Sequence, residues 1–248
     1  MIMYEADELV AEPTLVRTED FFIHTAEHRL AATTVYAPHG AAPSVVHLHG
    51  LGTTATRHVI RYLLDDLAAQ GHSSLTFEYS GNGESTGVLD ESTLRLRREE
   101  TMAAGALLSG DVRPVVMGTS MGAHLAACTV AQLRPRALVL FCPAAYPEDA
   151  ADTPFGKGLA RPGDYADSPA FAGIREFDGD LLVIGARHDE VVPAHVIDAY
   201  LAHAKKARSK RLIWLDTHHF VQRWLPGQEE PKEQVLQAIR AITTDSTR

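Results

Sequence analysis

The chain alternates short apolar runs with longer segments of helical spacing. Thr14–Ile23 and Leu30–Tyr36 are predicted as strands joined by the polar turn Thr25–Arg29, with no helix between them. Such a connection predicts an antiparallel pair at the edge of a sheet. From residue 44 the pattern becomes strand, helix, strand. This rhythm is typical of a mostly parallel sheet with helices on both faces, so we expect an α/β fold.

The expected strands beyond residue 44 are short and apolar. They are Ser44–Leu48, Ser74–Tyr79, Val115–Met117, Ala137–Phe141, Leu181–Gly185 and Lys210–Leu215. The expected helices are Thr56–Gln70, Glu91–Leu108, the small-residue segment after Gly122, Ala194–Lys206 and a C-terminal helix that starts near Pro231. The charged segment Glu91–Leu108 is predicted to face solvent.

One segment interrupts this rhythm. Pro143–Asp180 is rich in Pro, Gly and Asp, and it contains one short helical candidate, Ser168–Glu176. A long loop inside a compact fold is usually functional. We therefore predict a small mobile lid within a single domain of residues 1–248. In this hypothesis the lid has no role in the core, and its Tyr146 and Phe155 contact substrate. The alternative is a surface loop without substrate contact.

Composition and charge limit the classes of partner and the compartment that we expect for this protein. The formal net charge is −9 and no basic run occurs, so nucleic acid is an unexpected partner. The two cysteines, Cys128 and Cys142, lie in apolar stretches, which favours packed thiols in a reducing compartment over a disulfide. Residues 1–13 are acidic and aperiodic, which predicts a loose arm. Without a signal-peptide pattern or an apolar run of membrane length, we expect a soluble cytoplasmic protein.

The strongest chemical signal is Gly118-Thr119-Ser120-Met121-Gly122. An apolar run precedes it and a small-residue helix follows it. Gly-x-Ser-x-Gly in a strand–turn–helix setting predicts a nucleophilic serine, here Ser120. Five residues of this kind also occur by chance on surface turns, so the flanking strand and helix carry the prediction.

A serine hydroxyl is a poor nucleophile unless a base takes its proton and a carboxylate orients that base. The two strands after Pro143–Asp180 end in the sequences RHDEVVP and THHF. Asp189 or Glu190 could supply the carboxylate. His218 or His219 could supply the base. The carboxyl ends of parallel strands share one edge of a sheet, so these side chains are expected near the serine.

A tetrahedral oxyanion requires two preorganised N–H donors. One is expected from the backbone of Met121, at the head of the helix after the serine. The other is expected from the backbone of Leu51, in the sequence HLHGLG at the end of an apolar strand. His47 and His49 are interpreted as loop-shaping residues. Two histidines without a third ligand make a poor metal site, so no metal is predicted.

Taken together, HLHGLG, FEYSGNGESTG, GTSMG, HDEVVP and THHF resemble the α/β-hydrolase superfamily over about residues 14–245. The resemblance is closest to short-lid carboxylic-ester hydrolases such as feruloyl esterases and monoacylglycerol lipases. It implies an α/β-hydrolase fold, a triad of Ser120, His219 and Asp189, and no cofactor. It also implies an oxyanion hole formed by Leu51 and Met121.

The resemblance makes Glu190 a solvent-facing neighbour or a support of the acid. Val191 and Phe220, beside the acid and the base, join Tyr146 and Phe155 as expected substrate contacts. Many relatives have Asp-x-Arg-Gly-x-Gly-x-Ser where this chain has Glu78 and Ser80, so the loop assigns no subfamily.

The expected activity is hydrolysis of a small-molecule carboxylic ester or thioester of modest size through an acyl-enzyme. One alternative uses the same triad for acyl transfer, cyclisation or elimination. The other is a non-catalytic binding module. The sequence leaves the acyl group, the leaving group and the oligomeric state open.

Overall fold

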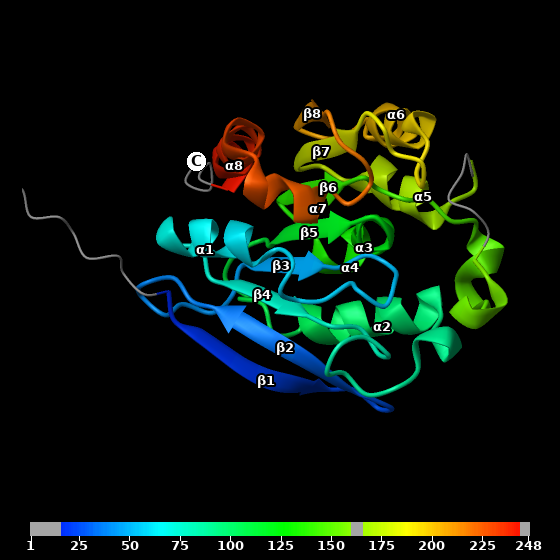
Figure 1. The fold of residues 1–248 in the computed structure, drawn as a ribbon, viewed down its shortest axis with the longest axis horizontal. Coiled ribbons are helices and arrows are strands. Elements are labelled where there is room, and N and C mark those ends of the chain that lie inside the picture. The colour runs from blue at the N-terminus through cyan, green and yellow to red at the C-terminus, as the bar shows by residue number, and fades with distance from the viewer. Residues whose placement is uncertain (1–15, 160–165, 244–248) are drawn as a thin grey trace, which may run out of the picture.

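The computed structural model of the chain describes residues 16–159 and 166–243 (Figure 1). The predicted arm at residues 1–13 lies outside this part of the chain. The described residues form an eight-stranded sheet with the strand order β1-β2-β4-β3-β5-β6-β7-β8. The α/β prediction is confirmed.

The strands lie close to their predicted positions. They are β1 (Thr18–His24), β2 (Arg29–Val35), β3 (Val45–Leu48), β4 (Ser74–Phe77), β5 (Val115–Thr119), β6 (Ala137–Phe141), β7 (Asp180–Ala186) and β8 (Ser209–Leu215). β1 pairs antiparallel with β2, and β2 pairs antiparallel with β4. From β4 to β8 every pairing is parallel. The antiparallel pair at the N-terminal edge is therefore confirmed.

Helices cover both faces of the sheet (Figure 1). They are α1 (Arg61–Ala69), α2 (Leu94–Gly105), α3 (Met121–Cys128), α4 (Val130–Leu133), α5 (Pro169–Glu176), α6 (Ala194–His203), α7 (Val221–Trp224) and α8 (Glu229–Thr243). Short 3₁₀ turns lie at η1 (Leu89–Glu91), η2 (Glu148–Asp152), η3 (Phe155–Lys157) and η4 (Leu225–Gly227). The first helix begins at Arg61, later than predicted, because the preceding residues form turns.

Side chains of the central strands contribute to two hydrophobic clusters, one on each face of the sheet. In β6, Leu138 and Leu140 belong to the cluster beneath α2, α3, α5 and α6. Val139 and Phe141 belong to the cluster beneath α1 and α8. Successive side chains of a strand point to opposite faces, so an all-apolar strand requires cover on both sides.

The sequence predicted that helix α2 faces solvent, but one side of the helix is buried. Arg97 is fully buried and Glu100 is 1% exposed. The Nη2 of Arg97 donates to Asn82 Oδ1 at 2.9 Å, and its Nε donates to Ser92 Oγ at 3.2 Å. The Arg97 guanidinium also lies 4.9 Å from the centre of the Tyr79 ring. These neutral partners satisfy a buried cation, so the prediction is wrong for the inner face of the helix.

The predicted lid segment contributes to the core. Tyr146 is 3% exposed, and Phe171 and Ile174 of α5 are fully buried. Helix α5 packs closely on α3, because a Cβ at Gly173 would lie 1.9 Å from the Ala127 carbonyl oxygen. The prediction that the segment has no role in the core is therefore wrong. Its Pro, Gly and Asp content obscured apolar positions that pack only in three dimensions. Residues 160–165 lie outside the described residues.

Both cysteines, Cys128 and Cys142, are free thiols. Cys142 is buried and Cys128 is half-buried, as the sequence predicted. Among residues 16–159 and 166–243, no helix combines the length and the apolar character that crossing a bilayer requires.

Candidate active site

Ser120 occupies a sharp turn between β5 and α3. Its backbone has φ +53° and ψ −112°, a conformation that non-glycine residues rarely adopt. The flanking glycines permit close approach of neighbouring backbone. A Cβ at Gly118 would lie 2.5 Å from Ala123 Cα, and one at Gly122 would lie 2.0 Å from the Leu48 carbonyl oxygen. The turn therefore depends on glycine at both positions, and it holds the serine at the end of β5.

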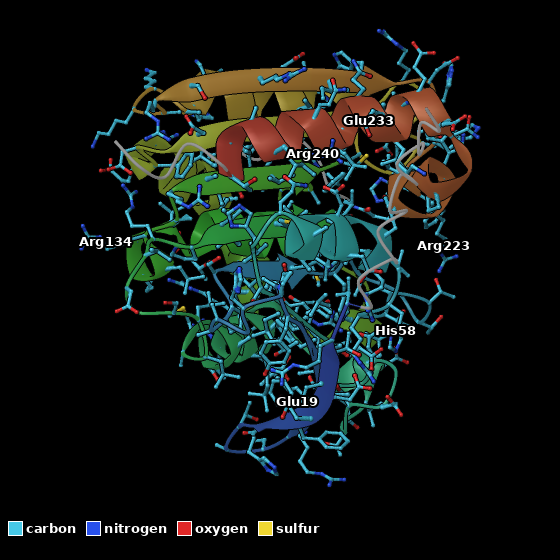
Figure 2. The ribbon with its side chains drawn as sticks, turned by 90° about the vertical axis from the view of Figure 1, so that its left-hand side faces the viewer. Glu19, His58, Arg134, Arg223, Glu233 and Arg240 are labelled. Carbon is cyan, nitrogen blue, oxygen red and sulfur yellow. The ribbon has the colours of Figure 1, made fainter. Side chains whose placement is uncertain are left out.

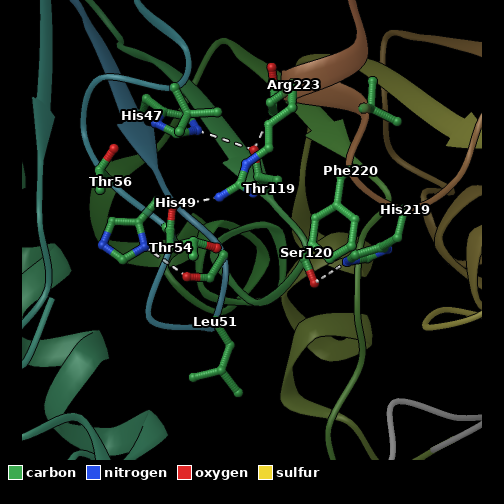
Figure 3. A pocket seen from close by; sticks show the side chains of 15 residues that line it. His47, His49, Leu51, Thr54, Thr56, Thr119, Ser120, His219, Phe220 and Arg223 are labelled. Atoms are coloured by element: carbon green, nitrogen blue, oxygen red, sulfur yellow. Dashed lines mark hydrogen bonds between the residues drawn. The ribbon is translucent and has the colours of Figure 1, made fainter. Parts of the chain in front are cut away.

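Ser120, His219 and Asp189 form a hydrogen-bonded line across three strand ends. His219 Nε2 lies 3.0 Å from Ser120 Oγ, and Figure 3 shows the two side chains pointing toward each other. His219 Nδ1 lies 2.7 Å from Asp189 Oδ2. The three residues follow β5, β8 and β7, whose carboxyl ends meet at one edge of the sheet.

The environment of Asp189 keeps its carboxyl group ionised. Burial alone would raise its pKa, but hydrogen bonds hold the pKa below its ordinary value. The donors are His219 and the backbone N–H groups of Val192 and Val191, at 2.8 and 2.9 Å from Oδ1. An ionised carboxylate accepts only, so His219 Nδ1 carries the proton. In neutral His219, Nε2 is then free to accept the Ser120 hydroxyl proton.

The neighbouring candidates lie outside this line. His218 Nδ1 lies 3.0 Å from the carbonyl oxygen of His188, and the His218 side chain is exposed. Glu190 is also exposed. The structure thus brings Asp189 and His219 to the serine, while Glu190 and His218 point elsewhere.

The backbone N–H groups of Leu51 and Met121 lie on either side of the serine. Met121 begins α3 directly after Ser120. A Cβ at Gly50 would lie 3.4 Å from Ser120 Cβ, so the Gly50–Leu51 peptide passes beside Ser120. In the described part of the chain, neither N–H donates a hydrogen bond to another protein group. Both are available to a developing negative charge, as an oxyanion hole requires.

His49 fixes the orientation of the Gly50–Leu51 peptide. Its Nε2 accepts the backbone N–H of Tyr79 at 3.0 Å, so Nδ1 carries the proton. That Nδ1 donates to the Gly50 carbonyl oxygen at 2.7 Å. The C=O and N–H of a trans peptide point in opposite directions, so the Leu51 N–H is held facing away from His49. The sequence identified His49 as loop-shaping, and the structure gives the contact through which it acts.

The geometry agrees with the family comparison. The sequence model of the alpha/beta hydrolase family matches residues 45–228. The chain belongs to this family. The match covers the strands, the turn and the loops that bring Ser120, Asp189 and His219 together.

Solved structures share the fold of this alpha/beta hydrolase. The Pyrococcus furiosus esterase Pf2001 superposes with a TM-score of 0.70 at 20% identity, covering 92% of each chain. Est1E from Butyrivibrio proteoclasticus, solved with ferulic acid bound, gives 0.69 at 19% identity over 91% of this chain and 98% of its own. The thioesterase domain from the curacin biosynthetic pathway gives 0.66 at 13% identity over 89% and 99%. No curated protein sequence matches the chain.

A cavity of about 80 Å³ opens beside Ser120 of the hydrolase. It lies between the loop after β3 and the first residues of α7 (Figure 3). Its lining residues are His47, His49, Gly50, Leu51, Thr54, Ala55, Thr56, Val59, Thr119, Ser120, His219, Phe220, Val221, Gln222 and Arg223. Burial lowers the pKa of His47 and His49 to about 3, so both are neutral at physiological pH.

The predicted substrate contacts divide between the cavity and other places. Phe220 lines the cavity and is 63% exposed. Tyr146 lies in the core with its ring edge-on to His124 at 5.1 Å, and the Phe155 ring covers the Arg97 guanidinium. Val191 is exposed and does not line the cavity. The structure therefore brings only Phe220 of the four to the space beside the serine.

Cys142 is a neighbour of the site that the sequence analysis did not single out. Burial, together with the charge and hydrogen bonding of Asp189, raises the pKa of its thiol well above the usual value. Ligand atoms of Cys142, Asp189 and His219 lie within 4.8 Å of one another, but the bond between Asp189 and His219 accounts for that grouping. The sequence signal that could have identified Cys142 is its position, because it directly follows β6 at the edge where Ser120, Asp189 and His219 lie.

Proposed function

We propose that this alpha/beta hydrolase cleaves a carboxylic ester or thioester through an acyl-enzyme on Ser120. The observation that carries the proposal is the line from Ser120 Oγ to His219 Nε2 at 3.0 Å and from His219 Nδ1 to Asp189 Oδ2 at 2.7 Å. A nucleophile, a base and an orienting carboxylate at these distances can perform acyl transfer without a further group.

In the first half-reaction His219 Nε2 takes the Ser120 hydroxyl proton while Oγ bonds to the substrate carbonyl carbon. The carbonyl oxygen becomes an oxyanion, which the N–H groups of Leu51 and Met121 stabilise. Asp189 stabilises the imidazolium that forms. Collapse of the tetrahedral intermediate breaks the bond to the leaving alcohol or thiol, which receives its proton from His219.

In the second half-reaction a water molecule replaces the leaving group. His219 takes one proton from the water, whose oxygen bonds to the acyl carbon. The second tetrahedral intermediate collapses with loss of the bond to Ser120 Oγ, which releases the carboxylic acid, and His219 returns its proton to that Oγ. The oxyanion donors act again, because the developing charge lies on the same oxygen.

The substrate class rests on the site and on the neighbours together. Two of the similar structures are named as an esterase and a thioesterase domain, and one contains ferulic acid. Similarity at these identities supports only the fold. The arrangement of Ser120, His219 and Asp189 in this chain supports the proposed reaction. The small cavity favours a group of modest size beside the scissile bond.

The decisive experiment labels the nucleophile. A fluorophosphonate probe should modify Ser120, as mapped by peptide mass spectrometry, and should block turnover of p-nitrophenyl butyrate. Ser120→Ala should lose both labelling and turnover. Ser109→Ala is the matched control, because Ser109 lies outside the site and its hydroxyl accepts the nearby backbone N–H of Asp111 at 3.3 Å. Labelling at another residue, or turnover by Ser120→Ala within tenfold of wild type, contradicts the proposal.

Hydrolysis is distinguished from acyl transfer by the products. The acylated enzyme is offered water alone, and then water with an added alcohol or amine. Free carboxylic acid in both reactions supports hydrolysis. A new ester or amide as the main product assigns the same triad to transfer, while a cyclic or unsaturated product assigns it to cyclisation or elimination.

A further inference from the structure

The cavity beside Ser120 has an unusual charge balance for an acidic protein. None of its lining residues is acidic, and Arg223 is the one lining residue with a permanent charge. His47 and His49 are neutral, since burial lowers the pKa of each to about 3. The whole chain has a net charge of −9, so a cavity lined by one cation and no carboxylate differs in sign from the chain as a whole.

Arg223 reaches across the cavity mouth from α7. Its Nη2 donates to the Thr54 carbonyl oxygen at 2.9 Å, which joins the wall beside His219 to the loop after β3 (Figure 3). Its guanidinium lies 5.8 Å from the centre of the Phe220 ring. Two neutral contacts, the Thr54 carbonyl oxygen and the Phe220 ring, therefore hold the charged group at the opening.

The Arg223 guanidinium has no acidic partner in the part of the chain that the structure describes. Among residues 16–159 and 166–243, no carboxylate lies within 4.0 Å of it. Arg57, by contrast, pairs with Glu78 at 2.7 Å on the other side of the same loop. A guanidinium has five N–H donors in a planar fork that matches carboxylate and phosphate oxygens. Most of these donors on Arg223 remain available.

We propose that Arg223 binds an anionic group of the substrate. The preferred substrate is then an ester or thioester with a carboxylate or phosphate at one end. Leu51, Val59 and Phe220 line the same cavity and suit a short apolar spacer between that anion and the scissile bond. The inference rests on the proposed function and adds to it the charge of the substrate.

The competing explanation is that Arg223 only holds the Thr54 loop in place. If Arg223 only held this loop, its loss would lower kcat/KM equally for every substrate, because the same loop contains the Leu51 N–H. Anion binding would affect charged substrates more than neutral ones. The ratio of kcat/KM between an anionic and a neutral substrate therefore separates the two explanations.

Two substrate pairs locate the anion. The first pair compares mono-p-nitrophenyl glutarate, with a carboxylate on the acyl group, with p-nitrophenyl hexanoate. The second compares butyryl-coenzyme A, with phosphates on the leaving group, with the neutral thioester S-butyryl-N-acetylcysteamine. Wild type should favour the anionic member of at least one pair, and added salt should weaken that preference.

The variants are Arg223→Gln, which removes the charge, and Arg223→Lys, which keeps it without the planar fork. Arg223→Gln should lower the anionic-to-neutral ratio about tenfold, and Arg223→Lys should lower it less. Arg134→Gln is the matched control. Arg134 is an exposed arginine at the opposite side of the molecule from Arg223 (Figure 2), and its variant should keep the wild-type ratio.

The proposal is overturned if Arg223→Gln keeps both wild-type ratios, or lowers kcat/KM equally for the anionic and neutral members. If the enzyme turns over none of these compounds, anion binding is tested by a binding measurement instead. Calorimetry should then show mono-p-nitrophenyl glutarate or butyryl-coenzyme A binding to Ser120→Ala more tightly than to Ser120→Ala/Arg223→Gln. Equal affinities reject anion binding. Loss of turnover with retained, Arg223-dependent binding rejects only the hydrolase proposal.

Discussion

The Nδ1 of His49 lies 2.7 Å from the carbonyl oxygen of Gly50, the next residue in the chain. This contact fixes the peptide whose N–H belongs to Leu51. The other ring nitrogen of His49 is held by the Tyr79 N–H, which determines the tautomer. A neutral, fully occupied histidine therefore orients one expected donor of the oxyanion hole.

The contact predicts that His49→Ala lowers kcat more than it changes KM. Loss of one oxyanion donor costs about 10²–10³-fold in kcat. Affinity for a trifluoromethyl ketone, which forms a tetrahedral adduct, should fall in parallel. His58→Ala is the control, because His58 is an exposed histidine on the turn before α1. A kcat for His49→Ala within threefold of wild type would show that the Leu51 peptide keeps its orientation unaided.

The line of three side chains predicts a strong effect of Asp189→Asn. The amide would favour the wrong tautomer of His219, and the expected loss in kcat is about 10⁴-fold. Glu190→Gln makes the same chemical change at the next, exposed position and should keep nearly full activity. Ester turnover is the measurement. If Asp189→Asn lowers kcat only slightly and Glu190→Gln lowers it severely, the carboxylate that orients His219 is Glu190 and not Asp189.

The base is tested by comparing two adjacent histidines. His219→Ala should lose as much activity as Ser120→Ala, and the double variant should lose little more, because members of a triad act as a unit. His218→Ala should remain active, since its ring contacts the His188 carbonyl and not the serine. An inactive His218→Ala beside an active His219→Ala would exchange the two roles.

Asp189 also predicts a pH dependence of stability. Its folded pKa lies below the usual value, because hydrogen bonds outweigh burial. A carboxyl group with a depressed folded pKa contributes stability above its unfolded pKa, near 3.9, and that contribution is lost as the pH falls through the folded value. Urea unfolding should therefore show a larger difference between wild type and Asp189→Asn at pH 7 than at pH 3. An equal difference at both pH values would contradict the assignment.

Buried Arg97 predicts an unusual sensitivity to a conservative change. Burial lowers its pKa to about 10, and Asn82 and Ser92 accept hydrogen bonds from its guanidinium. Lysine cannot reach both acceptors with the same geometry, so Arg97→Lys should lower the free energy of unfolding by about 3 kcal/mol. Arg98→Lys, at the exposed next position, should leave it unchanged. Urea unfolding measures both, and equal effects would show that Arg97 is replaceable.

The order of strands and helices could be predicted from the sequence alone. Apolar runs such as Ala137–Phe141 require cover on both faces, and that requirement is written in the local pattern. The same pattern places the ends of β5, β7 and β8 at one edge, so Ser120 and the two pairs of candidate acids and bases were identifiable. Gly118 and Gly122 mark the turn, since no other residue fits there.

Side-chain direction and burial were decided only by the tertiary structure. Asp189 and Glu190 lie in the loop after β7, and His218 and His219 lie in the loop after β8. No regular period fixes where adjacent side chains of a loop point, so the sequence could not separate His219 from His218 or Asp189 from Glu190. Burial depends on what packs against a side chain, which is why charged Arg97 lies inside and Tyr146 lies in the core. Arg223 meets Thr54 across 169 positions of sequence. Such a contact exists only after the sheet has formed, because no local pattern relates a loop and a helix that distant strands bring together.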